Sequence, residues 1–95
     1  MLEYLYDAIR ANGGQPLGIT AQLANNGEPI TEDCVLIFHD DNQELAHVEG
    51  LYIADIDRWN FTVPAEVTEG RTGRHWYCIR HNGVNLCLNK PVYLV

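Results

Sequence analysis

The segment WYCIRHNGVNLCL, residues 76–88, holds two short runs of strand-forming residues on either side of an Asn-Gly pair. A two-residue type I′ turn needs positive φ at both central positions, and Asn-Gly accepts this most readily. The segment therefore predicts a β-hairpin that turns at Asn82-Gly83. In its register His81 pairs with Val84, and the pairing continues residue by residue away from the turn.

This register places Cys78 directly opposite Cys87, as a pair without mutual hydrogen bonds, whose Cα atoms lie roughly 4.5 Å apart. That separation is at the short end of disulfide geometry, so a cross-strand disulfide is one interpretation and two thiols on a sheet face is the other. The chain has three cysteines, an odd number. An odd number is more typical of a protein made in a reducing cytosol than of a disulfide-rich secreted domain.

The same register sorts the hairpin side chains onto two faces, because successive residues of a strand alternate. The predicted core face holds Tyr77, Ile79, Val84, Leu86 and Leu88, and the outward face holds Trp76, Cys78, Arg80, Asn85, Cys87 and Asn89. His81 falls on the core side, away from the cysteines, and the chain has no Cys-x-x-Cys or His-x-x-x-His pair. We therefore expect no metal site.

Turn signals recur along the rest of the chain, and the runs between them are short and rich in β-branched and aromatic residues. This pattern predicts a single all-β domain, a sandwich or a barrel. The expected strands are Glu3–Arg10, Leu17–Leu23, Cys34–His39, Leu45–Val48, Leu51–Ala54, Arg58–Val63, Arg74–Arg80, Val84–Leu88 and Val92–Val95.

In two of the expected strands, the sequence also predicts which side chains are buried. RWNFTV alternates, so Trp59, Phe61 and Val63 should point into the core. CVLIFH is apolar at successive positions, which indicates a central strand covered on both faces. Pro91 should end or bend the last strand because it has no amide N–H to donate.

The first segment, MLEYLYDAIR, has a mixed pattern. Leu2, Leu5 and Ile9 have helical spacing, whereas Tyr4 and Tyr6 alternate as in a strand. We favour an edge strand able to pair with a neighbouring chain, with one or two helical turns as the alternative.

Charge and hydropathy exclude several classes of function. The formal net charge is -7, and the six Lys and Arg residues form no basic stripe, so binding to nucleic acid or to an anionic membrane is not expected. No segment approaches the ~20 apolar residues that span a bilayer, and MLEYLYDAIR lacks the basic start of a signal peptide.

Candidate catalytic groups have simpler structural interpretations. The acidic run HDDNQE (residues 39–44) fits a solvated turn better than a calcium loop, and Asp55 and Asp57 fit polar turn positions. The chain contains no serine. His75 and Cys78 are three residues apart on one strand and so point to opposite faces. We discount the glycosylation pattern NFT at residues 60–62, and we expect no catalytic or cofactor-binding residues.

Beyond these patterns, residues 15–95 resemble the immunoglobulin-like domains of tailed-phage virion proteins, such as baseplate upper proteins and capsid accessory proteins. The resemblance rests on a Gly-x-Pro-Ile turn, a Trp-x-Phe-x-Val-Pro strand and a Thr-x-Gly-x-x-Gly corner. These correspond to Gly27-Glu28-Pro29-Ile30, to Trp59-Asn60-Phe61-Thr62-Val63-Pro64, and to Thr68, Gly70 and Gly73.

The resemblance implies an immunoglobulin-like antiparallel β-sandwich of about seven to nine short strands. It also implies a non-enzymatic virion subunit without cofactors, made in the host cytoplasm and bound to a major capsid or tail protein, often as a homo-oligomer. Because the chain lacks a fibre extension, we expect a capsid decoration protein. A tail or baseplate subunit and a carbohydrate- or ligand-binding module are the alternatives.

Residues 1–14 lie outside the resemblance and are expected to serve as a docking or oligomerisation segment. Aromatic and arginine side chains commonly anchor protein interfaces. The interface candidates are Leu2, Tyr4, Leu5, Tyr6, Ile9, Trp76 and Arg80.

Overall fold

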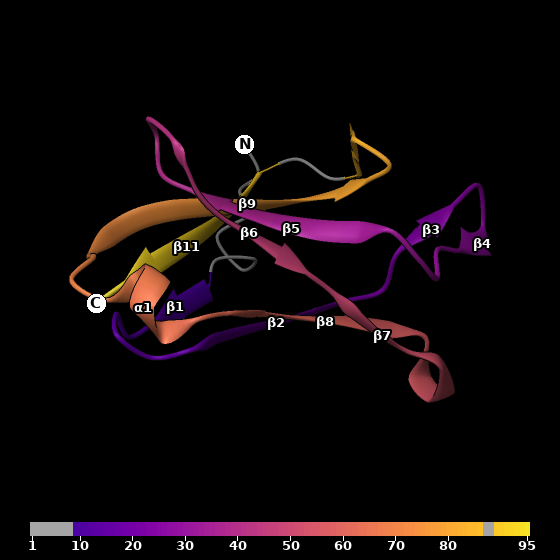
Figure 1. The fold of residues 1–95 in the computed structure, drawn as a ribbon, viewed down its shortest axis with the longest axis horizontal. Helices are drawn as coiled ribbons and strands as arrows, with labels where there is room; N and C mark the ends of the chain where they lie inside the picture. Colours follow the sequence, from indigo (N-terminus) through magenta and orange to yellow (C-terminus); the bar gives the residue numbers. More distant parts are fainter. Residues whose placement is uncertain (1–8, 87–88) are drawn as a thin grey trace, which may run out of the picture.

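The computed structural model describes residues 9–86 and 89–95, which form two packed β-sheets and a small separate hairpin (Figure 1). The strands are β1 (Ile9–Ala11), β2 (Leu17–Ala21), β3 (Ala24–Asn25), β4 (Glu28–Pro29), β5 (Cys34–His39), β6 (Glu44–Glu49), β7 (Leu51–Ile53), β8 (Arg58–Val63), β9 (Gly73–His81), β10 (Val84–Asn85) and β11 (Lys90–Leu94). A 3-10 turn, η2 (Ala54–Ile56), follows β7, and a one-turn helix, α1 (Ala65–Thr68), follows β8. The all-β prediction is confirmed.

The larger sheet forms the upper layer in Figure 1 and has six strands, in the order β1-β11-β9-β5-β6, with β10 paired to β9. β1 runs parallel to β11, whereas the other pairings in this sheet are antiparallel. The smaller sheet, β2-β8-β7, is antiparallel and forms the lower layer. β3 and β4 form a hairpin at one end of the sandwich.

The core lies between these layers, and Trp59 of β8 is at its centre. Trp59, Phe61 and Val63 are buried, as the alternation predicts. The Trp59 ring stacks on Phe61 at a centroid distance of 6.0 Å, and its indole N–H donates to the carbonyl of Ile30 at 2.7 Å. A buried indole N–H needs such a partner, so this bond ties the segment after β4 to the core.

The central strand β5 is covered on both faces, as predicted. Leu36 and Phe38 point into the sandwich and are fully buried, and Ile37, which points the other way, is only 1% exposed. β5 pairs with β9 from Cys34 opposite His81 to His39 opposite Trp76.

The chain passes from one sheet to the other at Gly50, the single residue between β6 and β7 (Figure 1). A Cβ atom at Gly50 would lie 2.5 Å from the Phe61 ring and 2.6 Å from the Trp59 ring. The close approach leaves no space for a side chain, so the change of sheet depends on glycine here.

Thr68 of α1 closes the end of the sandwich opposite the β3–β4 hairpin (Figure 1). Its side chain is fully buried, and its hydroxyl accepts a hydrogen bond from the N–H of Gly14 at 3.0 Å. The same hydroxyl lies 3.0 Å from the carbonyl oxygen of Gln15, to which it donates. The Thr-x-Gly corner therefore holds the β1–β2 connection against the segment that leads into β9.

The predicted hairpin register is confirmed next to its turn. Val84 pairs with His81 and Asn85 with Arg80, and Asn82 and Gly83 both have positive φ. The register then changes by two residues, because Lys90 pairs with Tyr77. The expected partner of Cys78, Cys87, lies outside the described residues.

Three details of the predicted strands were wrong. Val84 is 63% exposed rather than in the core, because the hairpin tip rises away from the lower layer (Figure 1). Pro91 does not end the strand, which was one of its two expected effects; it lies inside β11, since pairing with β1 begins only at the next residue, Val92. The β3–β4 hairpin and α1 were not predicted, because two-residue strands and a one-turn helix carry little periodicity.

We predict that Gly50→Ala destabilises the chain by about 1–3 kcal/mol, because the added methyl group forces the Trp59 and Phe61 rings apart. Urea unfolding monitored by tryptophan fluorescence measures the change. Gly18→Ala is the matched control, since a Cβ there meets no atom within 4 Å. Equal stability of the two variants would contradict the assigned role of Gly50.

Candidate binding face

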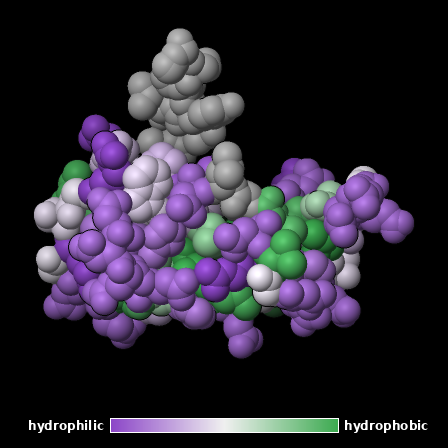
Figure 2. Space-filling view, turned by 90° about the horizontal axis from the view of Figure 1, so that it is seen from above, coloured by the Kyte–Doolittle hydropathy of each residue, from purple (hydrophilic) through white to green (hydrophobic). Residues whose placement is uncertain are grey.

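The side chains of the six-stranded sheet that point away from the core form what we term the outer face. Figure 2 views the molecule from this side, where hydrophilic residues surround smaller hydrophobic patches. From the strand register, the outer face carries Val35, Ile37 and His39 of β5, Arg74, Trp76, Cys78 and Arg80 of β9, and Tyr93 of β11.

Ile37 and Cys78 are cross-strand neighbours at the middle of the outer face. Cys78 points outward as predicted, yet it is only 3% exposed, and Ile37 is 1% exposed. The alternation of the strand gives the direction of a side chain but not what covers it. The side chains at the centre of this face are therefore nearly inaccessible to solvent, although they point outward.

An arginine–aromatic cluster, Arg74, Trp76 and Tyr93, lies on the outer face beside β11. The guanidinium carbon of Arg74 is 5.6 Å from the Trp76 ring centroid and 5.9 Å from that of Tyr93. Cation–π attraction at these distances holds the three side chains together. The Trp76 indole N–H also donates to Oδ1 of Asp41 at 2.8 Å, which fixes the ring against the β5–β6 loop.

The β5–β6 loop, residues 40–43, is a turn built by Asp40, as the sequence predicts. Its Oδ1 accepts hydrogen bonds from the backbone N–H of Asn42 at 2.7 Å and of Gln43 at 2.9 Å. These two bonds stabilise the charged carboxylate and lower the pKa of Asp40. The carboxylate therefore shapes the loop.

An ion-pair network links β6 to β9 on the other side of the face. Glu44 contacts Nε2 of His47 at 2.7 Å and the Arg80 guanidinium at 3.0 Å, and Arg80 also donates to the side-chain oxygen of Asn85 at 2.9 Å. The hydrogen bond with His47, followed by that with Arg80, lowers the pKa of Glu44.

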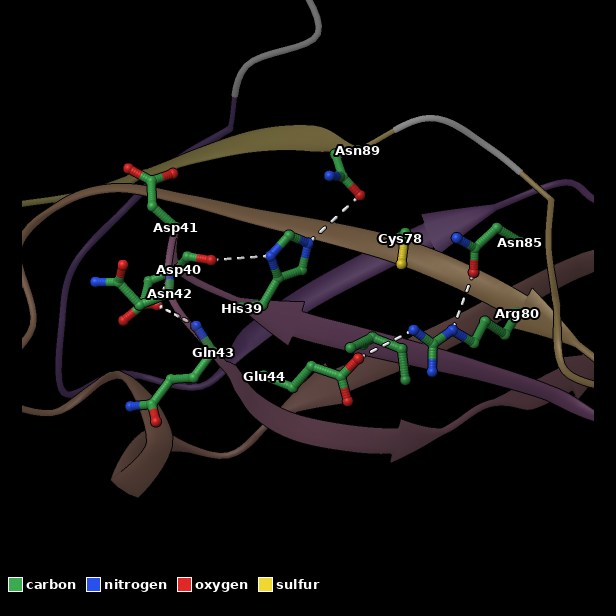
Figure 3. A pocket seen from close by; sticks show the side chains of 11 residues that line it. His39, Asp40, Asp41, Asn42, Gln43, Glu44, Cys78, Arg80, Asn85 and Asn89 are labelled. Atoms are coloured by element: carbon green, nitrogen blue, oxygen red, sulfur yellow. Dashed lines mark hydrogen bonds and ion pairs between the residues drawn. The ribbon is translucent and has the colours of Figure 1, made fainter.

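Two open hollows adjoin each other on this face. One, of about 340 Å³, extends over Ile37 and Cys78 to Glu44, Arg80 and Asn85, and the other, of about 310 Å³, reaches Trp76. They share four lining residues, which are His39, Asp40, Asp41 and Asn89. Figure 3 shows His39 between the Asp40 carbonyl and the Asn89 side chain, to which its ring nitrogens lie at 3.0 and 3.4 Å.

The structure brings two predicted interface residues to this face. Trp76 lies at one hollow and Arg80 at the other, and Asp41 and His39, which the sequence did not single out as interface residues, lie between them. Asp41 lies in the β5–β6 loop and His39 at the last position of β5, so strand periodicity alone did not mark them as interface residues. Ile9 belongs to edge strand β1. The other candidates, Leu2, Tyr4, Leu5 and Tyr6, lie outside the described residues.

The remaining chemical candidates occupy structural positions. His75 faces the core, stacked on Phe38 at 5.5 Å, so it points away from Cys78 as predicted. Asp57 accepts hydrogen bonds from the Tyr52 hydroxyl at 2.8 Å and the Gln22 amide at 3.0 Å, which confirms its turn role.

Within residues 9–86 and 89–95, no cluster of His, Cys, Asp or Glu could hold a metal ion. No helix in the same ranges is long and apolar enough to cross a membrane.

Comparison with known proteins identifies the fold. No family model matches the chain, and no curated protein matches it. A solved structure of the NK cell receptor NKp44, described as a triggering partner in natural cytotoxicity, matches over 93% of this chain and 94% of its own, with a TM-score of 0.51 and 14% identity. The chain has an immunoglobulin-like β-sandwich fold. At this identity the match concerns the fold alone.

We predict that Glu44→Gln lowers stability near neutral pH and has no effect in acid. Because the pKa of Glu44 is lowered on folding, the unfolded chain binds more protons between the two pKa values, and stability rises with pH there. The wild-type chain should therefore have a larger free energy of unfolding than Glu44→Gln above about pH 4.3, the ordinary pKa of glutamate. This difference should vanish as the pH falls through the lowered pKa of Glu44 in the folded chain.

Thermal unfolding across this pH range measures the effect. Glu49→Gln on the same strand is the control, because Glu49 forms no ion pair within the described residues. If Glu44→Gln remained less stable than the wild type at the lowest pH, the assigned ion-pair network would be contradicted.

Proposed function

We propose that this chain is a non-enzymatic structural subunit of a phage virion, a capsid decoration or head accessory protein that attaches to a symmetric shell. The resemblance of residues 15–95 to tailed-phage virion domains supports the assignment. The residues that carry it also build this fold, since Ile30 and Trp59 are bonded in the core and Thr68 closes one end.

The arginine–aromatic cluster, which lies close to β1, is the observation that supports a surface-binding role. Arg10 of β1 is in register with Tyr93 of β11, so the N-terminal segment leads into the sheet next to Arg74, Trp76 and Tyr93. Trp, Tyr and Arg side chains are the most frequent energetic anchors of protein interfaces. Residues 1–14 and this cluster together form the attachment surface.

The partner is a major capsid or tail protein, and the chain is part of the virion after synthesis in the host cytoplasm. A net charge of -7 opposes contact with packaged nucleic acid or an anionic membrane. Attachment as a homo-oligomer multiplies weak contacts through avidity.

The state of the reactive groups supports a role without catalysis. Hydrogen bonds lower the pKa of Asp40, Glu44 and Asp57, whereas a general base that works near neutral pH needs a raised carboxyl pKa. Burial raises the pKa of the Cys34 thiol, which suppresses its nucleophilic thiolate.

We predict that purified particles of the phage encoding this chain contain it in many copies, and that the isolated chain co-sediments with particles lacking it. Deletion of residues 1–8 leaves β1 intact and should weaken binding about tenfold or more, as should Trp76→Ala. Thr62→Ala, exposed on the other sheet, is the control. Absence of the chain from purified particles would contradict the proposal.

The 310 Å³ hollow favours a second candidate function, a carbohydrate- or ligand-binding module. Trp76 offers an aromatic surface there, and Asp41 and Asn89 offer hydrogen-bonding groups. A glycan array separates the two functions. Binding that Trp76→Ala abolishes, without any association with particles, would favour this module over the virion subunit.

A further inference from the structure

β6 is an open edge of the six-stranded sheet in the described part of the chain, where it pairs only with β5. Natural edge strands commonly carry Lys, Pro or inward-pointing charges that prevent pairing with another chain. β6, with the sequence ELAHVE, contains neither Lys nor Pro, and its β-bulge lies at the start of the strand, opposite Phe38 and His39, so that residues 46–49 pair regularly with β5. Its edge is therefore available for strand pairing.

One backbone hydrogen bond shows which groups of β6 face this edge. The N–H of Gly50 donates to the carbonyl of Cys34 at 3.2 Å, and β5 pairs antiparallel with β6 from Val35 opposite Glu49. Because such a ladder alternates, Val48 and Ala46 bond to β5. The N–H and C=O groups of His47 and Glu49 point to the open edge.

These outward groups restrict how a second copy can pair. In an antiparallel twofold pair, the residues that exchange hydrogen bonds must both face the shared edge. In one such register His47 of each copy lies opposite Glu49 of the other. The two Val48 residues then face each other at the twofold axis. The neighbouring register places two His47 side chains together instead.

Charge favours the first register. Glu49 forms no ion pair among the described residues, and the His47 side chain, which contacts Glu44 through Nε2, is 57% exposed. Like charges directly opposite each other destabilise a cross-strand pair, and this register keeps the Glu49 carboxylates of the two copies apart.

We propose that two copies of this chain associate through antiparallel pairing of their β6 strands, with His47 of each opposite Glu49 of the other. The two six-stranded sheets then join into one continuous sheet. Such a contact is smaller than the roughly 1,000 Å² typical of stable interfaces, so the dimer is weak. The dimer is independent of virion attachment.

Sedimentation of the isolated full chain over a concentration series tests the pairing. We expect a reversible monomer–dimer equilibrium. Hydrogen exchange should show that the amides of His47 and Glu49 gain protection as concentration rises. The Val48 amide, already bonded to β5, should not change. A chain that stays monomeric at every concentration, or a dimer that leaves the His47 and Glu49 amides unprotected, would overturn the proposal.

Two charge variants test the register. His47→Lys places a permanent cation opposite Glu49 and should tighten the dimer about three- to tenfold, whereas Glu49→Lys removes the carboxylate opposite His47 and should weaken it about tenfold or more. Thr62→Lys adds positive charge on the other sheet and should have no effect. Circular dichroism checks that each variant is folded. Equal dissociation constants for both β6 variants and the control would place the contact elsewhere.

Discussion

The hydrogen bond from the Trp59 indole to the Ile30 carbonyl is the interaction on which the sandwich depends most. It joins segments 29 residues apart and satisfies the one polar group of a large buried ring. The same ring stacks on Phe61 and leaves no room for a side chain at Gly50. One side chain thus positions the β3–β4 segment, the core of β8 and the passage of the chain between sheets.

That arrangement decides which surfaces are open to partners. With the smaller sheet packed on one face, the six-stranded sheet presents its outer face, and within the described residues β1 and β6 end its main strand order. The outer face carries Arg74, Trp76 and Tyr93 next to β1, and β6 lies on the far side of the sheet. The proposed attachment surface and the proposed self-pairing strand therefore lie at opposite edges of the sheet.

Local patterns predicted the strands whose burial follows directly from spacing. The alternation around Trp59 and Phe61, the apolar run of β5 and the Asn82-Gly83 turn each depend on neighbours a few residues away. The two-residue register change before Lys90 and the burial of Cys78 depend on distant segments. The same is true of the hollows, because the contact between Asp41 and Trp76 spans 35 residues.

By itself, the sequence determined an all-β domain, the inward residues of its central strands and the turn of its final hairpin, because strand period and turn chemistry are local properties. Only the tertiary structure decided that β1 pairs parallel to β11, that the chain changes sheets at Gly50 and that Trp76 and Arg80 share a hollowed face. These features come from contacts between segments far apart in the chain, whose energies no local pattern records.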